Sequence, residues 1–263
     1  MRKQTSTLTT YGVAIVRAMA LYQLDSKMLF KQAGLDFEAM KNPNARYPDT
    51  NLNHLVRLIL ERINDQAFGL TLAKFISPTT LHALGFSLLA SETLLAALQR
   101  LQRYYRIVND AVVINVEKDK TEYRVKLVFV NPVSPPEACL VDALVVLLVD
   151  ISRRLLDAEF APLSIDLERA KYDSEKPFFD YFRTAINYGA EQNMLVFDKN
   201  AIIKPLPTGN AELAYQNDKV VADYLARFDA NRLSERVRTI FIERLVTGKF
   251  SEEQIAEQLN LSL

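Results

Sequence analysis

Arginine and tyrosine side chains gather in one short stretch near the middle of the chain, at Arg100, Arg103, Tyr104 and Tyr105. Arginine beside tyrosine can hold a carboxylate through paired hydrogen bonds, or a planar group by stacking. Successive residues of a helix point about 100° apart, so we expect one tyrosine to be buried and the other to face a surface or cleft. An arginine-rich helix end also complements the helix dipole, and this simpler role stays open.

Two further residues complete the candidate ligand-binding set, His82 and Tyr123. His82 follows Leu81 in an apolar segment, so packing in a partly buried position is its simpler interpretation. The chain has two histidines and one cysteine, Cys139, without the spacing of a metal site. It also lacks a nucleophile elbow and a phosphate-binding glycine loop. We therefore expect no catalytic residue, no metal and no cofactor, and predict that the protein is not an enzyme.

Other polar or small residues in apolar segments have two interpretations each. Gly85 lies within an apolar helical segment. We expect that a glycine there allows two helices to approach closely, with room for a ligand as the alternative interpretation. Ser91 is expected to cap a helix, although a helix N-terminus can also bind an anion. Asp142 and Asp150 are expected on the solvated edge of a half-buried helix, with polar anchors in a pocket as the alternative.

The composition is that of an ordinary globular protein. The 263 residues carry a formal net charge of zero, and 49% of them are apolar. This balance shows no bulk attraction to nucleic acid or to an anionic membrane. A single cysteine and an N-terminus without an apolar core predict a cytoplasmic protein that has no membrane span.

Hydrophobic periodicity divides the chain into an N-terminal helical part and a part that contains strands. Residues 9–110 are predicted to be helical, with a helix beginning near Ser91. The runs 112–116 and 123–130 alternate in polarity and predict an antiparallel hairpin. An apolar helix through Leu156, a strand at PLSIDLER, a helix at FFDYFRTAI and a pair of strands at MLVFD and AIIKPL follow. The predicted fold class is α+β, with a small and mostly antiparallel sheet in the order β-β-α-β-α-β-β over residues 111–208.

Two amphipathic segments near the C-terminus have the pattern of a helix-turn-helix. Residues 233–248 and 251–263 each carry one apolar stripe, and a separate helix over 210–228 precedes them. Ser251 and Gln254 have capping-box spacing, and Ala256 is small enough for a helix to cross closely. Acidic and basic residues balance from Asn231 onward, so these residues alone are expected to bind DNA poorly.

The C-terminal pattern VRTIFIERLVTG followed by SEEQIAEQLNLS resembles the first part of the DNA-binding domain of AraC-type transcription regulators. In that resemblance Ser262 matches the serine that begins the recognition helix. The resemblance implies that Ser251, Gln254 and Ser262 belong to a DNA-binding module, and we expect the chain to end inside it. Specific DNA binding is expected of a full-length protein and not of residues 1–263.

A second resemblance covers the centre of the chain. The motifs Gly69-Leu70, Leu84-Gly85, Ser91 to Leu98 and Arg103-Tyr104 are similar to the N-terminal domain of the branch of AraC-type regulators that is labelled arabinose-binding. The run NYGAEQNMLVFDKNAIIKPLP also resembles that domain, through Asn193, Leu195, Phe197, Leu206 and Pro207. Members of this branch are associated with varied small metabolites, so the label does not imply arabinose.

The two resemblances predict a function and a division of the chain. Residues 1–230 are expected to sense a small-molecule effector, with residues 210–228 as a coupling helix, and residues 231–263 to begin the helix-turn-helix domain. A homodimer is compatible with this organisation. The alternative is a protein-interaction or dimerisation module that senses nothing.

Overall fold

The structure is a computed structural model that describes residues 5–130 and 135–245. Two compact units divide the chain, Met1–Asp218 and Lys219–Leu263. The first unit is α+β, as predicted, and holds all strands of the described residues. Helix α10 (Ala211–Leu245) begins in the first unit and continues in the second.

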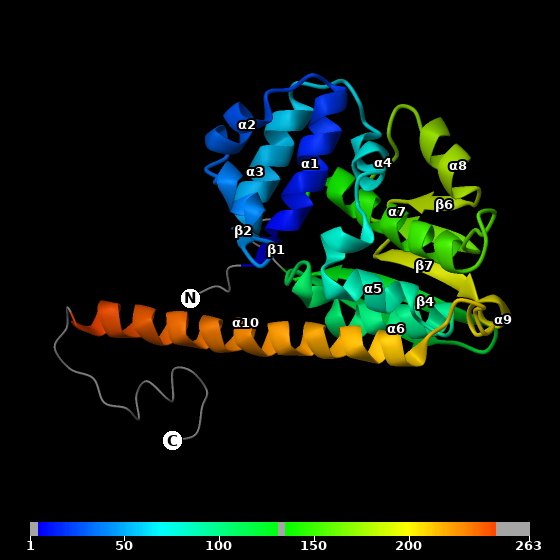
Figure 1. Ribbon diagram of the computed structural model, residues 1–263. Coiled ribbons are helices and arrows are strands. Elements are labelled where there is room, and N and C mark those ends of the chain that lie inside the picture. Colours follow the sequence, from blue (N-terminus) through cyan, green and yellow to red (C-terminus); the bar gives the residue numbers. More distant parts are fainter. Residues whose placement is uncertain (1–4, 131–134, 246–263) are drawn as a thin grey trace. The chain divides into compact units, whose positions relative to one another are not determined.

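The helical part runs from Ser6 to Ile107 (Figure 1). In chain order its elements are β1 (Ser6–Leu8), α1 (Thr9–Leu21), α2 (Ser26–Gln32), η1 (Phe37–Lys41), β2 (Arg46–Pro48), α3 (Asp49–Leu60), α4 (Phe68–Ala73), η2 (Pro78–Leu81), α5 (Ala83–Leu89), α6 (Leu94–Tyr104) and η3 (Tyr105–Ile107). Strands β1 and β2 pair antiparallel, a small sheet that the sequence did not predict. Each has only three residues, too few for a period-2 pattern to show.

The sheet part contains a five-stranded sheet in the order β3-β4-β7-β5-β6. Its elements are β3 (Val112–Lys118), β4 (Glu122–Phe129), α7 (Ala138–Leu155), β5 (Ser164–Leu167), α8 (Lys176–Phe182), β6 (Ile186–Tyr188), β7 (Asn193–Asp198) and α9 (Lys199–Ile202). All pairings are antiparallel except that of β5 with β6. The predicted hairpin is confirmed: Tyr123, Val125 and Leu127 face the core from β4, while the side chains between them are half-buried.

Several predicted boundaries are wrong. The segment AIIKPL is not a strand, because Asp198 caps α9 there, and the five-stranded sheet instead takes β6, which precedes β7 in the chain. Helix α6 begins at Leu94 with Thr93 as its N-cap, and Ser91 bonds back to the Ser87 carbonyl instead. The predicted helix over 210–228 does not end there. Helix α10 continues through Leu245, because no glycine or proline interrupts it at the expected break around residues 229–232.

Helix α7 is buried almost all round, as a helix between two layers must be. Figure 1 shows it between α4 and the sheet. Its contact with α4 depends on Gly69, because a Cβ atom there would lie 2.5 Å from the Cys139 carbonyl oxygen and 2.8 Å from Cβ of Asp142. The close approach expected at Gly85 is also present. A Cβ there would lie 2.7 Å from Cα of Pro78, so the glycine admits the backbone of η2.

Candidate functional site

A cavity of about 50 Å³ lies between the helical part and the sheet part of the first unit. Residues from α1 and α3 line one side, and residues from β3, β4 and α7 line the other. The lining residues are Thr7, Tyr11, Asp49, Leu52, Asn53, Tyr105, Val108, Asn109, Ala111, Val112, Phe129, Pro136, Leu140 and Leu144. A molecule in this cavity would therefore touch both parts of the unit.

The polar end of the cavity is a chain of hydrogen bonds that ends on a carboxylate. Oδ1 of Asn109 accepts from the Ala111 amide at 2.6 Å, which turns Nδ2 toward Thr7. Nδ2 then donates to Oγ1 of Thr7 at 2.7 Å, and that hydroxyl donates to Oδ1 of Asp49 at 2.6 Å. The sequence of donors and acceptors is fixed from the Ala111 amide to Asp49.

Asp49 is the charged group of the cavity. The residue is 5% exposed, and Oδ2 of its carboxylate has no hydrogen-bond partner in the described part of the protein. Burial raises the pKa of Asp49, and the Asp110 carboxylate adds to this, while the nearby hydroxyls of Thr5 and Thr7 and the Arg46 guanidinium lower it. A buried carboxylate oxygen without a partner is costly to fold, so it is a candidate for binding a ligand.

Two tyrosines also line the cavity, and both remain neutral phenols at ordinary pH. Tyr11 and Tyr105 are 7% and 5% exposed. Burial raises the pKa of both hydroxyls well above the usual range, and Asp49 raises that of Tyr105 further. Their rings, together with Leu52, Val112 and Leu144, give the cavity a largely apolar wall.

Of the candidate ligand residues predicted from the sequence, Tyr105 lines this cavity. The expected division of the two tyrosines is present, because Tyr105 is buried and Tyr104 is half-buried. Arg103 is exposed, and its guanidinium lies 5.7 Å from the centre of the Tyr104 ring. Arg100 instead pairs with Asp218 at 3.1 Å and donates to Oγ of Ser91 at 3.2 Å.

His82 and Tyr123 lie away from the cavity lining. His82 separates η2 from α5 with a φ of 57°, and its Nε2 lies 3.2 Å from Oδ1 of Asn44. Tyr123 is buried in β4 opposite Phe197 of β7. The structure thus does not bring the predicted set together in one pocket.

Sequence reasoning did not single out Thr7, Asp49, Asn53 or Asn109. Asp49 starts α3, a position where an acidic residue simply complements the helix dipole, so nothing local marks it. Its partners are remote, since Thr7 precedes it by 42 residues and Asn109 follows Thr7 by 102. The constellation exists only once β1 and the η3–β3 connection lie side by side, as the isolated bridge between Thr7 and Asn109 shows.

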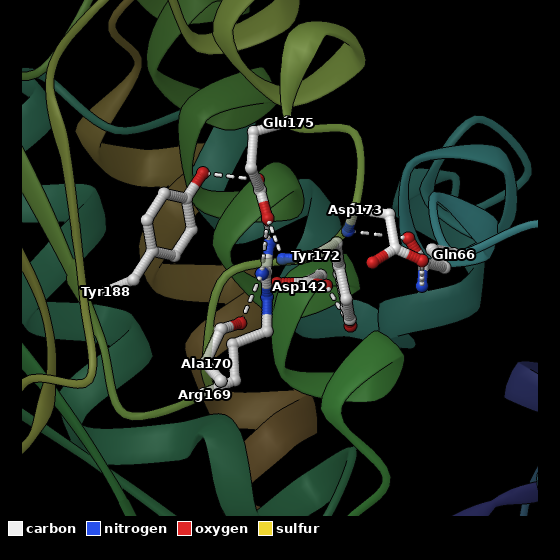
Figure 2. Close-up of polar contacts among 8 residues, drawn as sticks. All are labelled: Gln66, Asp142, Arg169, Ala170, Tyr172, Asp173, Glu175 and Tyr188. Carbon is white, nitrogen blue, oxygen red and sulfur yellow. Dashed lines mark hydrogen bonds and ion pairs between the residues drawn. The ribbon is translucent and has the colours of Figure 1, made fainter.

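A second polar cluster surrounds Arg169, after β5 (Figure 2). The Arg169 guanidinium pairs with Asp142 of α7 at 2.8 Å and with Glu175 at 3.0 Å. It also lies over the rings of Tyr172, Phe178 and Tyr188, at 3.7, 4.6 and 5.0 Å from their centres. The side chain of Arg169 is 8% exposed and that of Asp142 is 1% exposed. The expectation of a solvated edge is therefore wrong for Asp142.

The electrostatics of this cluster are those of a satisfied internal ion pair. Burial raises the pKa of Asp142 to about 6, although Arg169 and the Tyr172 hydroxyl oppose this. For Glu175 burial also acts upward, but hydrogen bonds from Arg169, Tyr188 and the Tyr172 amide outweigh it and lower the pKa. Because Arg169, Asp142 and Glu175 all find partners within the cluster, it holds the β5–α8 segment against α7 rather than offering a binding site.

The predicted DNA-binding residues Ser251, Gln254 and Ser262 lie outside the described residues. Within residues 5–130 and 135–245, no helix has the length and apolarity to cross a membrane. The same residues contain no group of three or more His, Cys, Asp or Glu side chains placed to hold a metal ion.

Comparison with known families decides the wider assignment. The family described as "Arabinose-binding domain of AraC transcription regulator, N-term" matches residues 24–206. The chain belongs to this family of AraC transcription regulators. The resemblance seen in the motifs between Gly69 and Pro207 is thus confirmed, and the first unit of the AraC-type chain contains the matched domain.

Relatives of this AraC-type chain are themselves regulators. It is 22% identical over 254 residues to the "Ornithine utilization regulator" of Pseudomonas aeruginosa, covering 96% of this chain and 74% of that protein. Its fold is similar to the crystal structure of the transcriptional regulator CdpR from Pseudomonas aeruginosa, with a TM-score of 0.54 and 13% sequence identity. This match covers 90% of this chain and 74% of CdpR. The likeness to CdpR concerns the fold alone.

Proposed function

We propose that the first unit senses a small-molecule effector in the cavity beside Asp49 and that the effector controls the DNA-binding part of an AraC-type regulator. The single observation that carries this proposal is the Asp49 carboxylate, which is buried at a cavity and has one oxygen without a hydrogen-bond partner. Such a group destabilises the ligand-free protein. A ligand that pairs with it would gain the free energy of a charge-assisted hydrogen bond.

The position of the cavity supports a sensing role. Its walls come from helices of the N-terminal part and from the sheet part, so a ligand would change how tightly the two are held together. A ligand shifts a conformational equilibrium only when it binds one arrangement better than the other. A cavity between two parts of a unit satisfies this condition, because its shape depends on their relative position.

A continuous series of contacts leads from the cavity to α10. Tyr105 lines the cavity directly after the end of α6. Arg100 of the same helix pairs with Asp218 in the first turns of α10. We infer that a change at Tyr105 is passed to α10 through α6 and this ion pair, and that α10 couples the effector to the rest of the regulator.

The DNA-binding step is proposed from the family and from the C-terminal pattern. In a full-length regulator the segment with Ser251, Gln254 and Ser262 would begin a helix-turn-helix module and bind DNA, and the regulator would act as a homodimer. We expect no sequence-specific DNA affinity from residues 1–263 by themselves, because the segment from Asn231 is charge-balanced. A gel shift that gave specific binding by residues 1–263 would contradict this.

A thermal-shift screen of small metabolites tests the sensing proposal. One chemical class should raise the melting temperature of the wild-type chain, because a ligand that binds the folded state stabilises it. Ala111→Val, which adds two methyl groups to the cavity wall, should remove this shift. Ala158→Val, at an exposed turn position, should keep it. Equal shifts in both variants, or no shift with any metabolite, would count against the proposal.

A second candidate function is protein association without sensing, which an exposed apolar groove favours. Phe86 of α5 and Leu213 of α10 are 45% and 52% exposed and line this groove with Leu89. Sedimentation velocity distinguishes the two functions. A dimer that Leu213→Glu dissociates, together with a flat metabolite screen, would favour association through this groove.

A further inference from the structure

We infer that the ligand of the Asp49 cavity is a small amine, which places its ammonium group on Asp49 Oδ2 and its short apolar body against the cavity wall. This inference rests on the proposed function and specifies the chemical class of the effector. It follows from the charge of the lining, from the fixed hydrogen bonds around Asp49 and from the size of the cavity.

The first argument is the sign of the charge. Among the described residues that line the cavity, Asp49 is the only charged one, and none of them is a lysine, arginine or histidine. The guanidinium of Arg46, which is not among the lining residues, is held by the carbonyl oxygens of Ser6 and Ile107 at 2.7 and 2.6 Å. A carboxylate or phosphate ligand would meet Asp49 without a compensating cation, which is repulsive in a partly buried site. An ammonium group would be attracted.

The second argument is the direction of the hydrogen bonds. Thr7 donates to Oδ1 of Asp49, and its hydroxyl is itself held by Nδ2 of Asn109. Thr7 therefore cannot turn to serve Oδ2, and this oxygen has no hydrogen-bond partner in the described part of the protein. A hydrogen bond from an ammonium group to a carboxylate also gains the attraction of opposite charges, which a neutral hydroxyl or amide donor lacks.

The third argument is the shape and polarity of the remaining wall. The lining also contains the apolar side chains of Leu52, Val112 and Leu144. A cavity needs roughly 10–15 Å³ of volume to hold one water molecule. A cavity of about 50 Å³ thus holds only a few non-hydrogen atoms. A primary amine with a short alkyl chain fits this volume, whereas a sugar ring does not.

Three molecules of matched length test the inference directly, namely butylamine, butan-1-ol and butyrate. Isothermal titration calorimetry with the chain of residues 1–263 should rank butylamine first, by about tenfold over the alcohol, since one charged hydrogen bond is worth that factor. Butyrate should not bind detectably. NMR locates the binding, because the side-chain amides of Asn53 and Asn109 line the cavity and should shift most strongly with the amine.

Two variants separate a specific contact from a general charge effect. Asp49→Asn retains an oxygen that can accept from Thr7 but removes the negative charge, so butylamine should bind about tenfold more weakly or not at all. Asp180→Asn changes the net charge equally on the exposed surface of α8 and should leave binding unchanged. If Asp49→Asn fails to fold, the wild-type ranking of the three molecules still decides the question.

The outcomes distinguish this inference from the proposed function. If butyrate or the alcohol shifts the Asn53 and Asn109 amides more strongly than butylamine does, the cavity binds ligands but the amine assignment is wrong. If butylamine binds equally to wild type and a folded Asp49→Asn, the assignment is also wrong. If none of the three binds while the metabolite screen gives a hit that Ala111→Val removes, the amine assignment falls and sensing stands.

Discussion

Nε of Arg100 lies 3.1 Å from Oδ2 of Asp218, and this ion pair joins α6 to the first turns of α10. The two side chains are 18% and 15% exposed. Ser87 of α5 donates to the other oxygen of Asp218, so α5 and α6 hold the same carboxylate. The start of α10 is therefore fixed to the rest of the first unit by a polar contact that has a defined geometry.

Arg100→Ala should lower the free energy of unfolding by about 1 to 3 kcal/mol, because Asp218 loses a charged hydrogen-bond partner in a partly buried site. Arg103→Ala is the matched control, since Arg103 is exposed on the same helix, and should change stability by less than about 0.5 kcal/mol. Urea unfolding measures both. Equal effects would show that the Arg100–Asp218 pair does not stabilise the unit.

Thr7→Val should destabilise the protein by about 2 to 3 kcal/mol, because it leaves Nδ2 of Asn109 and Oδ1 of Asp49 buried without their partner. Thr7→Ser keeps the hydroxyl and should recover most of that stability. Chemical denaturation of the two variants tests the hydrogen-bond chain. A serine variant as unstable as the valine variant would assign the effect to packing instead.

Gly85→Ala should destabilise the protein by about 3 kcal/mol, although alanine ordinarily favours a helix, because the added methyl group would collide with the backbone at Pro78. Gly12→Ala is the control in α1. Its Cβ would lie 2.9 Å from Cε2 of Tyr47 and 3.1 Å from Sδ of Met40, which are side-chain atoms that can move. Thermal unfolding should show a clearly smaller loss for Gly12→Ala.

The Arg169 cluster predicts a defined pH dependence of stability. The pKa of Asp142 is raised from 3.8 to about 6, so this carboxyl group binds a proton more tightly in the folded protein than in the unfolded chain. Its contribution to stability is present below pH about 4 and is lost as the pH rises through about 6, by about 2 to 3 kcal/mol. Urea unfolding from pH 4 to 7 should show this loss in the wild type and not in Asp142→Asn.

Glu175, in the same cluster, has a pKa shifted in the opposite direction, so its effect on stability depends on pH in the opposite way and serves as an internal comparison. The pKa of Glu175 is lowered, so its contribution to the free energy of unfolding is present above its usual pKa and is lost as the pH falls. Glu175→Gln should therefore flatten the acid side of the stability curve and leave the loss toward pH 6 in place. A Glu175→Gln curve that also lacked the loss toward pH 6 would argue against the assignment to Asp142.

The sequence was informative wherever hydrophobic spacing is long and regular. The β3–β4 hairpin follows from the alternation of Tyr123, Val125 and Leu127, and α7 follows from an apolar run introduced by two prolines. The family follows from motifs such as Gly69-Leu70 and Asn193 to Phe197, which fall within the matched range. These features are local, so a pattern over about ten residues is enough to predict them.

Short elements were missed or misplaced because their signal is weak. Strands β1, β2 and β6 have three residues each, and helix α9 has four. What makes β6 a strand is its parallel pairing with β5, which lies beyond the intervening α8. Pairing of this kind depends on the neighbouring strand and leaves little mark on the residues themselves.

The sequence by itself determined the fold class, the principal helices, the hairpin and the family, because periodicity and motifs are properties of contiguous residues. Only the tertiary structure decided where a site could be. It placed Thr7, Asp49 and Asn109 in one hydrogen-bond chain and paired Arg100 with Asp218. It also buried Asp142 against Arg169. The physical reason is that the pKa and the hydrogen bonds of a polar side chain depend on neighbours that folding brings from distant parts of the chain.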